Sequence, residues 1–122
     1  MTSVKISKIT WGKIIVNGIE YNQILIIGSN IEEREYDRLK SLFGTSHKIG
    51  DWEIEKLFSG SPEIILIGTG WDGVLEVHDK IIKQADKLNI KLEILKSEEA
   101  ISKYNELAKD RKRVNALIHT TC

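Results

Sequence analysis

The sequence predicts a mixed α/β domain in which helices pack on the faces of a β-sheet. Short runs of β-branched and apolar residues, which are typical of strands, occur in both halves of the 122-residue chain. In the second half these runs alternate with amphipathic helical patterns, and a β-α-β-α-β order packs as a sheet with right-handed crossovers. At this length one domain is expected, and no linker composition or internal repeat divides residues 1–122.

The first third of the chain is β-like and contains a predicted hairpin. Asn17-Gly18 separates predicted strands at 13–16 and 19–21, and both turn residues accept the positive φ of a type I′ turn. Residues 24–27, Ile-Leu-Ile-Ile, predict a further strand that is apolar enough to be buried on both faces. Residues 31–50 match helical spacing only roughly, so no element is assigned to them.

A short helix and a buried strand are predicted in the middle of the chain. Asp51 is the expected N-cap of a helix over residues 52–59, with Gly60 at its C-terminal end. The run at 63–67 predicts a strand that leads directly into a glycine-rich loop.

Two further helices and two strands complete the prediction. A helix near 78–88 is followed by a strand at 91–95, by a helix that Ser97 can cap, and by a strand at 113–119. The apolar face of the first helix comprises Val77, Ile81, Ala85 and Leu88, and that of the second comprises Ala100, Ile101, Tyr104, Leu107 and Ala108.

Charge balance and cysteine content argue against several classes of protein. Lys plus Arg total 18 and Asp plus Glu total 18, whereas a general nucleic-acid binder has a basic excess. No apolar run is long enough to span a membrane, and the N-terminus has no signal-peptide pattern. The single cysteine rules out an internal disulfide and fits a reducing compartment. We therefore expect a cytoplasmic protein that binds neither nucleic acid nor membrane.

The loop Gly68-Thr-Gly-Trp-Asp-Gly73 matches the dinucleotide-binding pattern G-x-G-x-x-G, and Glu93 lies 20 residues beyond its last glycine. That mechanism requires a helix to begin within the glycines, where its N-terminus meets the pyrophosphate. Here Val74-Leu-Glu-Val77 intervenes, Glu93 falls in mid-strand, and Trp71 would crowd the pyrophosphate. The loop is therefore interpreted first as a strained turn, at a sheet edge where ligands nevertheless tend to bind. Trp71 either covers the core or anchors a partner.

His119 and Cys122 suggest a Cys–His nucleophile, but strand geometry argues against one. Side chains alternate along a strand, so positions three apart point to opposite faces unless the chain turns after His119. We instead expect His119 to make a buried hydrogen bond and Cys122 to pack as a small apolar group.

Metal and cofactor sites are not predicted. The residues His47, His78, His119 and Cys122 include no pair at metal-ligand spacing. We therefore expect no metal and no cofactor, and no complete catalytic constellation can be identified locally.

Several motifs, in order over nearly the whole chain, resemble those of a known family. They are Trp11-Gly12 with Asn17-Gly18, His47, Ile67-Gly68-x-Gly70, Ala100, Tyr104-Asn105, Arg113-Val114 and His119-x-Thr121-Cys122. On these motifs the chain resembles the domain-of-unknown-function family that includes the adipogenesis-associated Mth-type domain protein and a mitochondrial complex I assembly factor. The resemblance implies a three-layer α/β fold around a central mixed sheet in which one strand runs antiparallel to the rest. It also implies that no enzymatic activity or cofactor is established, and that eukaryotic relatives resemble assembly or interaction proteins.

The chain departs from the family pattern ahead of His47. Relatives carry a tryptophan-rich, arginine-bearing strand there, whereas this chain has Tyr36-Asp-Arg-Leu-Lys-Ser-Leu-Phe43. No role is therefore carried over to Arg38. Respiratory-complex assembly is not carried over either, because nothing in the chain indicates a mitochondrial address.

The leading functional hypothesis is a non-enzymatic domain that binds an unidentified protein partner or a small ligand. The candidate binding residues are His47, Gly68, Gly70, Trp71, Arg113, His119 and Cys122. Arg113 begins its strand and His119 ends it, roughly 20 Å away at strand rise, so the two share a small pocket only if the chain bends. The alternative is an enzyme or ligand-dependent protein that binds an anionic small molecule at the Gly68–Gly73 turn. The expected assembly is a monomer or a weak homo-oligomer, in which an edge strand can pair with itself.

Overall fold

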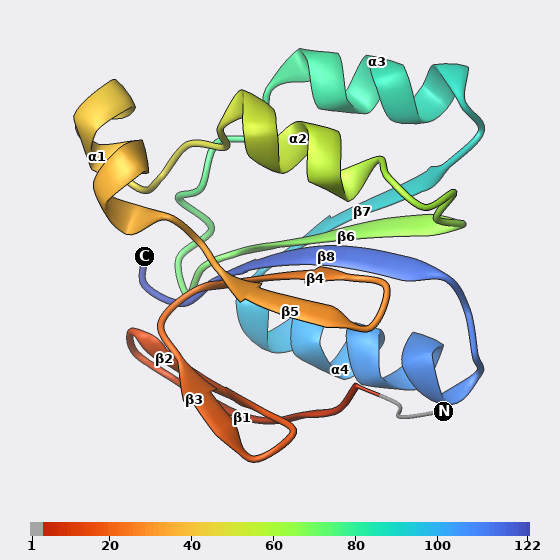
Figure 1. Cartoon of the computed structure of the whole chain (residues 1–122), viewed down its shortest axis with the longest axis horizontal. Coiled ribbons are helices and arrows are strands. Elements are labelled where there is room, and N and C mark those ends of the chain that lie inside the picture. Colours follow the sequence, from red (N-terminus) through yellow and green to blue (C-terminus); the bar gives the residue numbers. More distant parts are fainter. Residues whose placement is uncertain (1–3) are drawn as a thin grey trace.

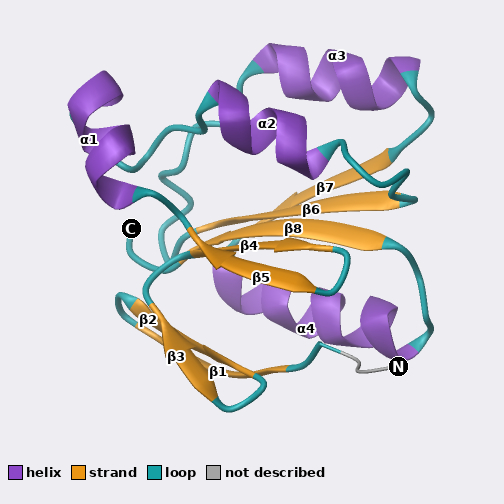
Figure 2. Ribbon diagram, in the orientation of Figure 1, coloured by secondary structure: helices purple, strands orange, loops and turns teal. Residues whose placement is uncertain are grey.

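The computed structural model describes residues 4–122 and arranges them in three layers (Figure 1, Figure 2). The middle layer is a five-stranded sheet with the order β5 (Asn30–Glu33), β4 (Ile24–Ile27), β8 (Val114–His119), β6 (Ile64–Thr69) and β7 (Lys91–Leu95). Helices α2 (Asp51–Leu57) and α3 (Asp79–Lys87) cover one face. The other face is covered by α4 (Ser97–Lys109) and by a three-stranded sheet of β1 (Ile6–Thr10), β2 (Lys13–Val16) and β3 (Ile19–Tyr21). The remaining helix, α1 (Tyr36–Phe43), lies at one end of the molecule, beside the C-terminus.

The five-stranded sheet is mixed, and one of its strands runs opposite to all the others. β8 and β7 are both parallel to β6, whereas β4 is antiparallel to β8. β5 is antiparallel to β4 and therefore has the direction of the remaining three. The single antiparallel strand that the family resemblance implied is thus β4, and the predicted mixed α/β class is confirmed.

Two apolar clusters hold the layers together. One lies between α4, the strands β1 and β2, and one face of the large sheet. The other lies between α2, α3 and the opposite face. β6 and β8 are buried along their whole length because helices or strands cover them on both sides. Their apolar sequences match the pattern of strands that face no solvent.

Most of the predicted elements are confirmed. Asn17 and Gly18 have φ of 50° and 81° and join two antiparallel strands, as a type I′ hairpin requires. The strand 91–95 has the predicted bounds, and the strand at 24–27 is almost wholly buried. The third helix begins at Asp79, well after the glycine loop, so the dinucleotide pattern indeed lacks its helix.

Three details of the helical prediction were wrong. Gly50, and not Asp51, is the N-cap of α2, while Asp51 occupies the first turn. Lys96 is the N-cap of α4, whereas Ser97 is its first helical residue and its hydroxyl bonds to Gly70 and His119. Leu88 does not join the buried face of α3, since it is 51% exposed just beyond the helix end.

The unassigned region 31–50 contains most of β5 and all of α1. Gly28-Ser29 joins β4 to β5 in a tight hairpin, and Gly28 adopts a φ of 60° that favours glycine. α1 buries Leu39 alone, which explains why its helical pattern is weak.

Candidate functional site

A cavity of about 300 Å³ lies where β5, α1 and the segment after β8 meet. Its lining includes Gly12, Gln23, Arg34, Tyr36, Ser46 and Thr121. These residues come from the β1–β2 turn, from both sides of the β4–β5 hairpin, from α1 and its following loop, and from the end of the chain. The fold therefore gathers the cavity wall from segments that are far apart in sequence.

Arg34 forms the centre of a buried polar network behind this cavity. Its side chain is 1% exposed and pairs with Glu53, whose side chain is 0% exposed, at 2.7 Å between Nε and Oε2. The guanidinium group donates five hydrogen bonds, to both carboxylate oxygens of Glu53, to Gln23 Oε1 and to the carbonyls of Ser46 and Lys48. Arginine has five N–H donors, so Arg34 is fully used within the protein.

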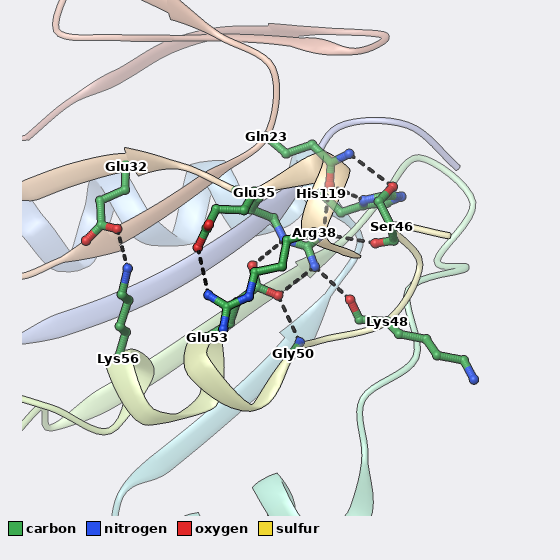
Figure 3. Close-up of polar contacts among 11 residues, drawn as sticks. Gln23, Glu32, Glu35, Arg38, Ser46, Lys48, Gly50, Glu53, Lys56 and His119 are labelled. Carbon is green, nitrogen blue, oxygen red and sulfur yellow. Dashed lines mark hydrogen bonds and ion pairs between the residues drawn. The ribbon is translucent and has the colours of Figure 1, made fainter. Parts of the chain in front are cut away.

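The network extends to His119, at the end of β8. Gln23 immediately before β4, Ser46 in a loop, Glu53 in α2 and His119 at the end of β8 lie close together around this network (Figure 3). Gln23 Oε1 accepts from Arg34 and lies 2.6 Å from His119 Nδ1. Because an amide oxygen can only accept, the proton of the imidazole is on Nδ1. His119 Nε2 is then an acceptor, and the Thr121 hydroxyl, 3.1 Å away, donates to it.

Burial keeps His119 neutral. It lowers the pKa of this imidazole to about 4, and the electrostatic effects of Arg34 and His47 act in the same direction. The His47 ring meets His119 edge-on, with 5.1 Å between ring centroids. The prediction that His119 makes a buried hydrogen bond is therefore confirmed.

We expect the free energy of unfolding to fall as the pH drops from 6.5 to 4. Over this range the histidine becomes protonated in the unfolded chain but stays neutral in the folded protein, because folding lowers the pKa of His119 to about 4. The loss can reach about 3 kcal/mol at 1.4 kcal/mol for each pH unit. Urea denaturation at several pH values, for the natural chain and for His119→Asn, measures it. The difference between the two chains should change with pH, and parallel profiles would contradict the role of His119.

The Gly68–Gly73 turn is occupied by the chain's own final residues. Trp71 N–H donates to the carbonyl of Thr121 at 2.8 Å, and Asp72 and Val74 N–H groups donate to the main-chain oxygen of Cys122 at 2.8 and 3.1 Å. Gly70 N–H donates to Ser97 Oγ at 2.8 Å, and that hydroxyl donates in turn to the carbonyl of His119. The backbone N–H groups of Gly70, Trp71, Asp72 and Val74 are therefore already engaged within the protein.

The structure divides the predicted site residues into three groups. His47 and His119 are in ring contact beside the Arg34 network. Gly70, Trp71 and Cys122 meet at the glycine turn, while Gly68 packs in β6 against Ser97 and Ala100 of α4. Arg113 precedes β8, at the far end from His119, and bonds to the carbonyl of Ser61 through its side chain. Arg113 is therefore separated from His119 by the length of β8, as expected, and does not line the cavity.

Four residues of the network and cavity were not identified from the sequence. Arg34, Glu53, Gln23 and Ser46 carry no motif, and Arg34 lies in the charged run Glu32-Glu33-Arg34-Glu35, which looks like a solvated surface. One signal was available for the hairpin that positions Arg34, because Gly-Ser after an apolar strand is a known turn pattern.

Comparison with known proteins identifies the family. A model of a family described as "Protein of unknown function (DUF498/DUF598)" matches residues 6–119. The chain belongs to this family. A DUF498/DUF598 domain therefore accounts for nearly its whole length, and the resemblance found on the sequence motifs is confirmed.

Two solved structures have the same fold. The conserved hypothetical protein PH1505 from Pyrococcus horikoshii OT3 is 32% identical, with a TM-score of 0.82 over 97% of this chain and 99% of that one. A Bordetella pertussis protein described as a Mth938-like domain is 16% identical, with a TM-score of 0.62 over 96% of this chain and 85% of that one.

A curated relative carries a more specific name. The "13 kDa major membrane protein" of Francisella tularensis subsp. holarctica (strain LVS) is 29% identical over 107 residues, which are 88% of this chain and 83% of that protein. Within residues 4–122, none of the helices is both long enough and apolar enough to cross a bilayer.

Proposed function

We propose that this DUF498/DUF598 domain is a non-enzymatic binding module that holds a small molecule in the cavity beside Arg34. The carrying observation is a cavity of about 300 Å³ whose wall is held by a fully hydrogen-bonded buried network. Ligand pockets in proteins begin at roughly this volume. A wall whose side chains are already fixed loses little conformational entropy when a ligand arrives.

The lining favours a neutral or weakly cationic ligand over an anion. Arg34 borders the cavity, but its five N–H groups are already engaged within the protein. Glu33, also in the lining, adds a negative charge at an exposed position. The hydroxyl and amide groups of Thr121, Ser46 and Gln23 offer neutral hydrogen bonds, and the Tyr36 ring offers an apolar surface.

The chemistry at His119 supports the non-enzymatic assignment. The chain Thr121–His119–Gln23 has the order of a nucleophile, a base and an orienting group. However, the orienting group is a neutral amide, which cannot stabilise an imidazolium as a carboxylate does. With its pKa lowered to about 4, His119 is also a poor general base near neutral pH.

Native mass spectrometry of the purified protein tests the proposal, followed by titration with whichever small molecule it retains. Tyr36→Ala should weaken that binding about tenfold, because it removes a ring that lines the cavity and is 50% exposed. Leu42→Ala is the matched control, since Leu42 lies on the same helix and is 62% exposed but does not line the cavity. Equal binding by both variants would place the ligand elsewhere.

A protein partner is the second candidate function, favoured by the exposed side of α1. Leu42 is 62% and Phe43 is 38% exposed, and Trp11, next to the cavity residue Gly12, is 58% exposed. Variants on this helix also separate the two functions. If Leu42→Ser abolishes binding of a protein partner but leaves binding of a small ligand unchanged, the result would favour the protein partner.

The setting that we propose is cytoplasmic. It is supported by the single cysteine, Cys122, which is half-buried and unpaired in the described part of the chain. The relative named as a membrane protein makes cell fractionation the direct test. Recovery in the membrane fraction after a high-salt wash would overturn the cytoplasmic assignment.

A further inference from the structure

The outer edge of β7 carries backbone groups that are oriented for another strand. β7 is the last strand in the sheet order, with β6 on its inner side. Lys91 N–H donates to the carbonyl of Glu63, so the backbone groups of residues 91, 93 and 95 face β6. Along a strand these groups alternate in direction, and the N–H and C=O groups of Leu92 and Ile94 therefore face outward.

Glu93, in the middle of this edge strand, has a carboxylate with too few partners. Its Oε2 atom is buried and has no hydrogen-bond partner among residues 4–122. The nearest cation is Lys91, on the same strand, whose Nζ lies 3.8 Å from the other oxygen and whose side chain is 63% exposed. A second cation next to Glu93 would therefore satisfy a carboxylate that is otherwise incompletely bonded.

We propose that β7 pairs antiparallel with β7 of a second copy of this chain, with Leu92 opposite Leu92, forming a weak and reversible homodimer. In this register Leu92 of each copy donates its N–H to the Leu92 carbonyl of the other. Lys91 of one copy then faces Glu93 of the second copy, and Glu93 faces Lys91, so two ion pairs form across the two-fold axis. Lys91 and the opposite Glu93 form a non-hydrogen-bonded pair, the kind with the closest Cα approach in an antiparallel ladder, about 4.5 Å.

The apolar side of the edge is also self-complementary in this register. Leu92 and Ile94 of β7 and Ile90 just before it point to the same side of the sheet, where Ile90 and Leu92 pack against the cluster beneath α2 and α3. Ile94 is 41% exposed in the isolated chain, and pairing places it opposite Ile90 of the second copy. The dimer therefore covers an apolar side chain that is otherwise in water.

A shift of the centre to Glu93 is excluded by charge. That register also satisfies the outward N–H and C=O groups, because Leu92 then faces Ile94. However, it brings the two Glu93 carboxylates directly opposite each other at closest approach, which is destabilising. Of these two registers, charge therefore favours the one in which Lys91 meets Glu93, and the pairing goes beyond the ligand-binding role of the cavity.

Sedimentation velocity over a range of protein concentrations tests the dimer with three variants. Lys91→Glu places acidic residues opposite acidic ones, and Glu93→Lys places basic residues opposite basic ones. Each single variant should dimerise about tenfold more weakly than the natural chain. The double variant Lys91→Glu/Glu93→Lys restores opposite charges at both positions and should dimerise as the natural chain does.

A mixture of the two single variants provides the decisive measurement. Lys91→Glu carries only acidic residues at the two positions and Glu93→Lys only basic ones, so each should prefer the other. A heterodimer should therefore form more readily than either single variant pairs with itself. A natural chain that stays monomeric at every concentration, or a mixture that associates no better than its components, would overturn the proposal. Circular dichroism spectra confirm that each variant is folded.

Discussion

Replacing Glu53 by alanine is expected to lower the free energy of unfolding by about 3–5 kcal/mol. The carboxylate is completely buried and accepts two hydrogen bonds from Arg34 and a third from Gly50 N–H, at the start of α2. Its removal leaves the Arg34 guanidinium buried without a counter-charge, and an uncompensated buried charge costs much more than a lost surface contact. Urea denaturation monitored by circular dichroism measures the difference.

Two further variants distinguish a buried-charge effect from a simple loss of contacts. Lys56, which is on the same helix as Glu53, forms a half-exposed ion pair with Glu32 of β5. Lys56→Ala breaks this pair and should lower the free energy of unfolding by no more than about 1 kcal/mol. The double replacement Arg34→Met/Glu53→Leu removes both charges, so it should cost less than Glu53→Ala alone. If Glu53→Ala proved as mild as Lys56→Ala, the Arg34 network would not be what fixes the cavity wall.

The sequence contains enough local information to predict most of the large sheet. β6 and β8 are continuous apolar runs because both their faces are covered, and such runs can be recognised without knowledge of the fold. The Asn17-Gly18 hairpin is also locally determined, since its two positive φ angles suit those two residue types. The direction of β4 is different in kind. It depends on the pairing of β4 with β8, a strand about ninety residues later in the chain. Only the family resemblance predicted that one strand would be antiparallel to the others.

The candidate site could be predicted much less well, because its contacts join residues that are distant in sequence. His119 stands out through its position at a strand end, but its partner Gln23 is separated from it by 96 residues. Arg34 and Glu53 are charged residues among many, and only burial distinguishes them from those on the surface. Ser97 illustrates the same limit at close range. A serine before a helix predicts a cap, whereas its hydroxyl here connects Gly70 to His119.

Replacing Gly70 by alanine should destabilise the protein by about 2–6 kcal/mol, because backbone strain and a steric clash act together. Gly70 has a backbone φ of 103°, a conformation that residues other than glycine rarely adopt. A Cβ atom at this position would lie 2.3 Å from the carbonyl carbon of Cys122 and 2.7 Å from the carbonyl oxygen of Thr121. Main-chain atoms cannot rotate away as the end of a side chain can, so the final residues would have to leave the glycine turn.

Gly44→Ala is the matched control for the backbone strain. Gly44 ends α1 with a φ of 75°, and a Cβ there would meet nothing within 4 Å. This variant should cost only about 1 kcal/mol, and the difference between the two variants isolates the contact with residues 121 and 122. The same contact is tested by Gly70→Ala in a chain shortened after Thr120, where the cost should fall towards that of Gly44→Ala. An unchanged cost in the shortened chain would show that the close approach of Cys122 is not the reason for glycine at position 70.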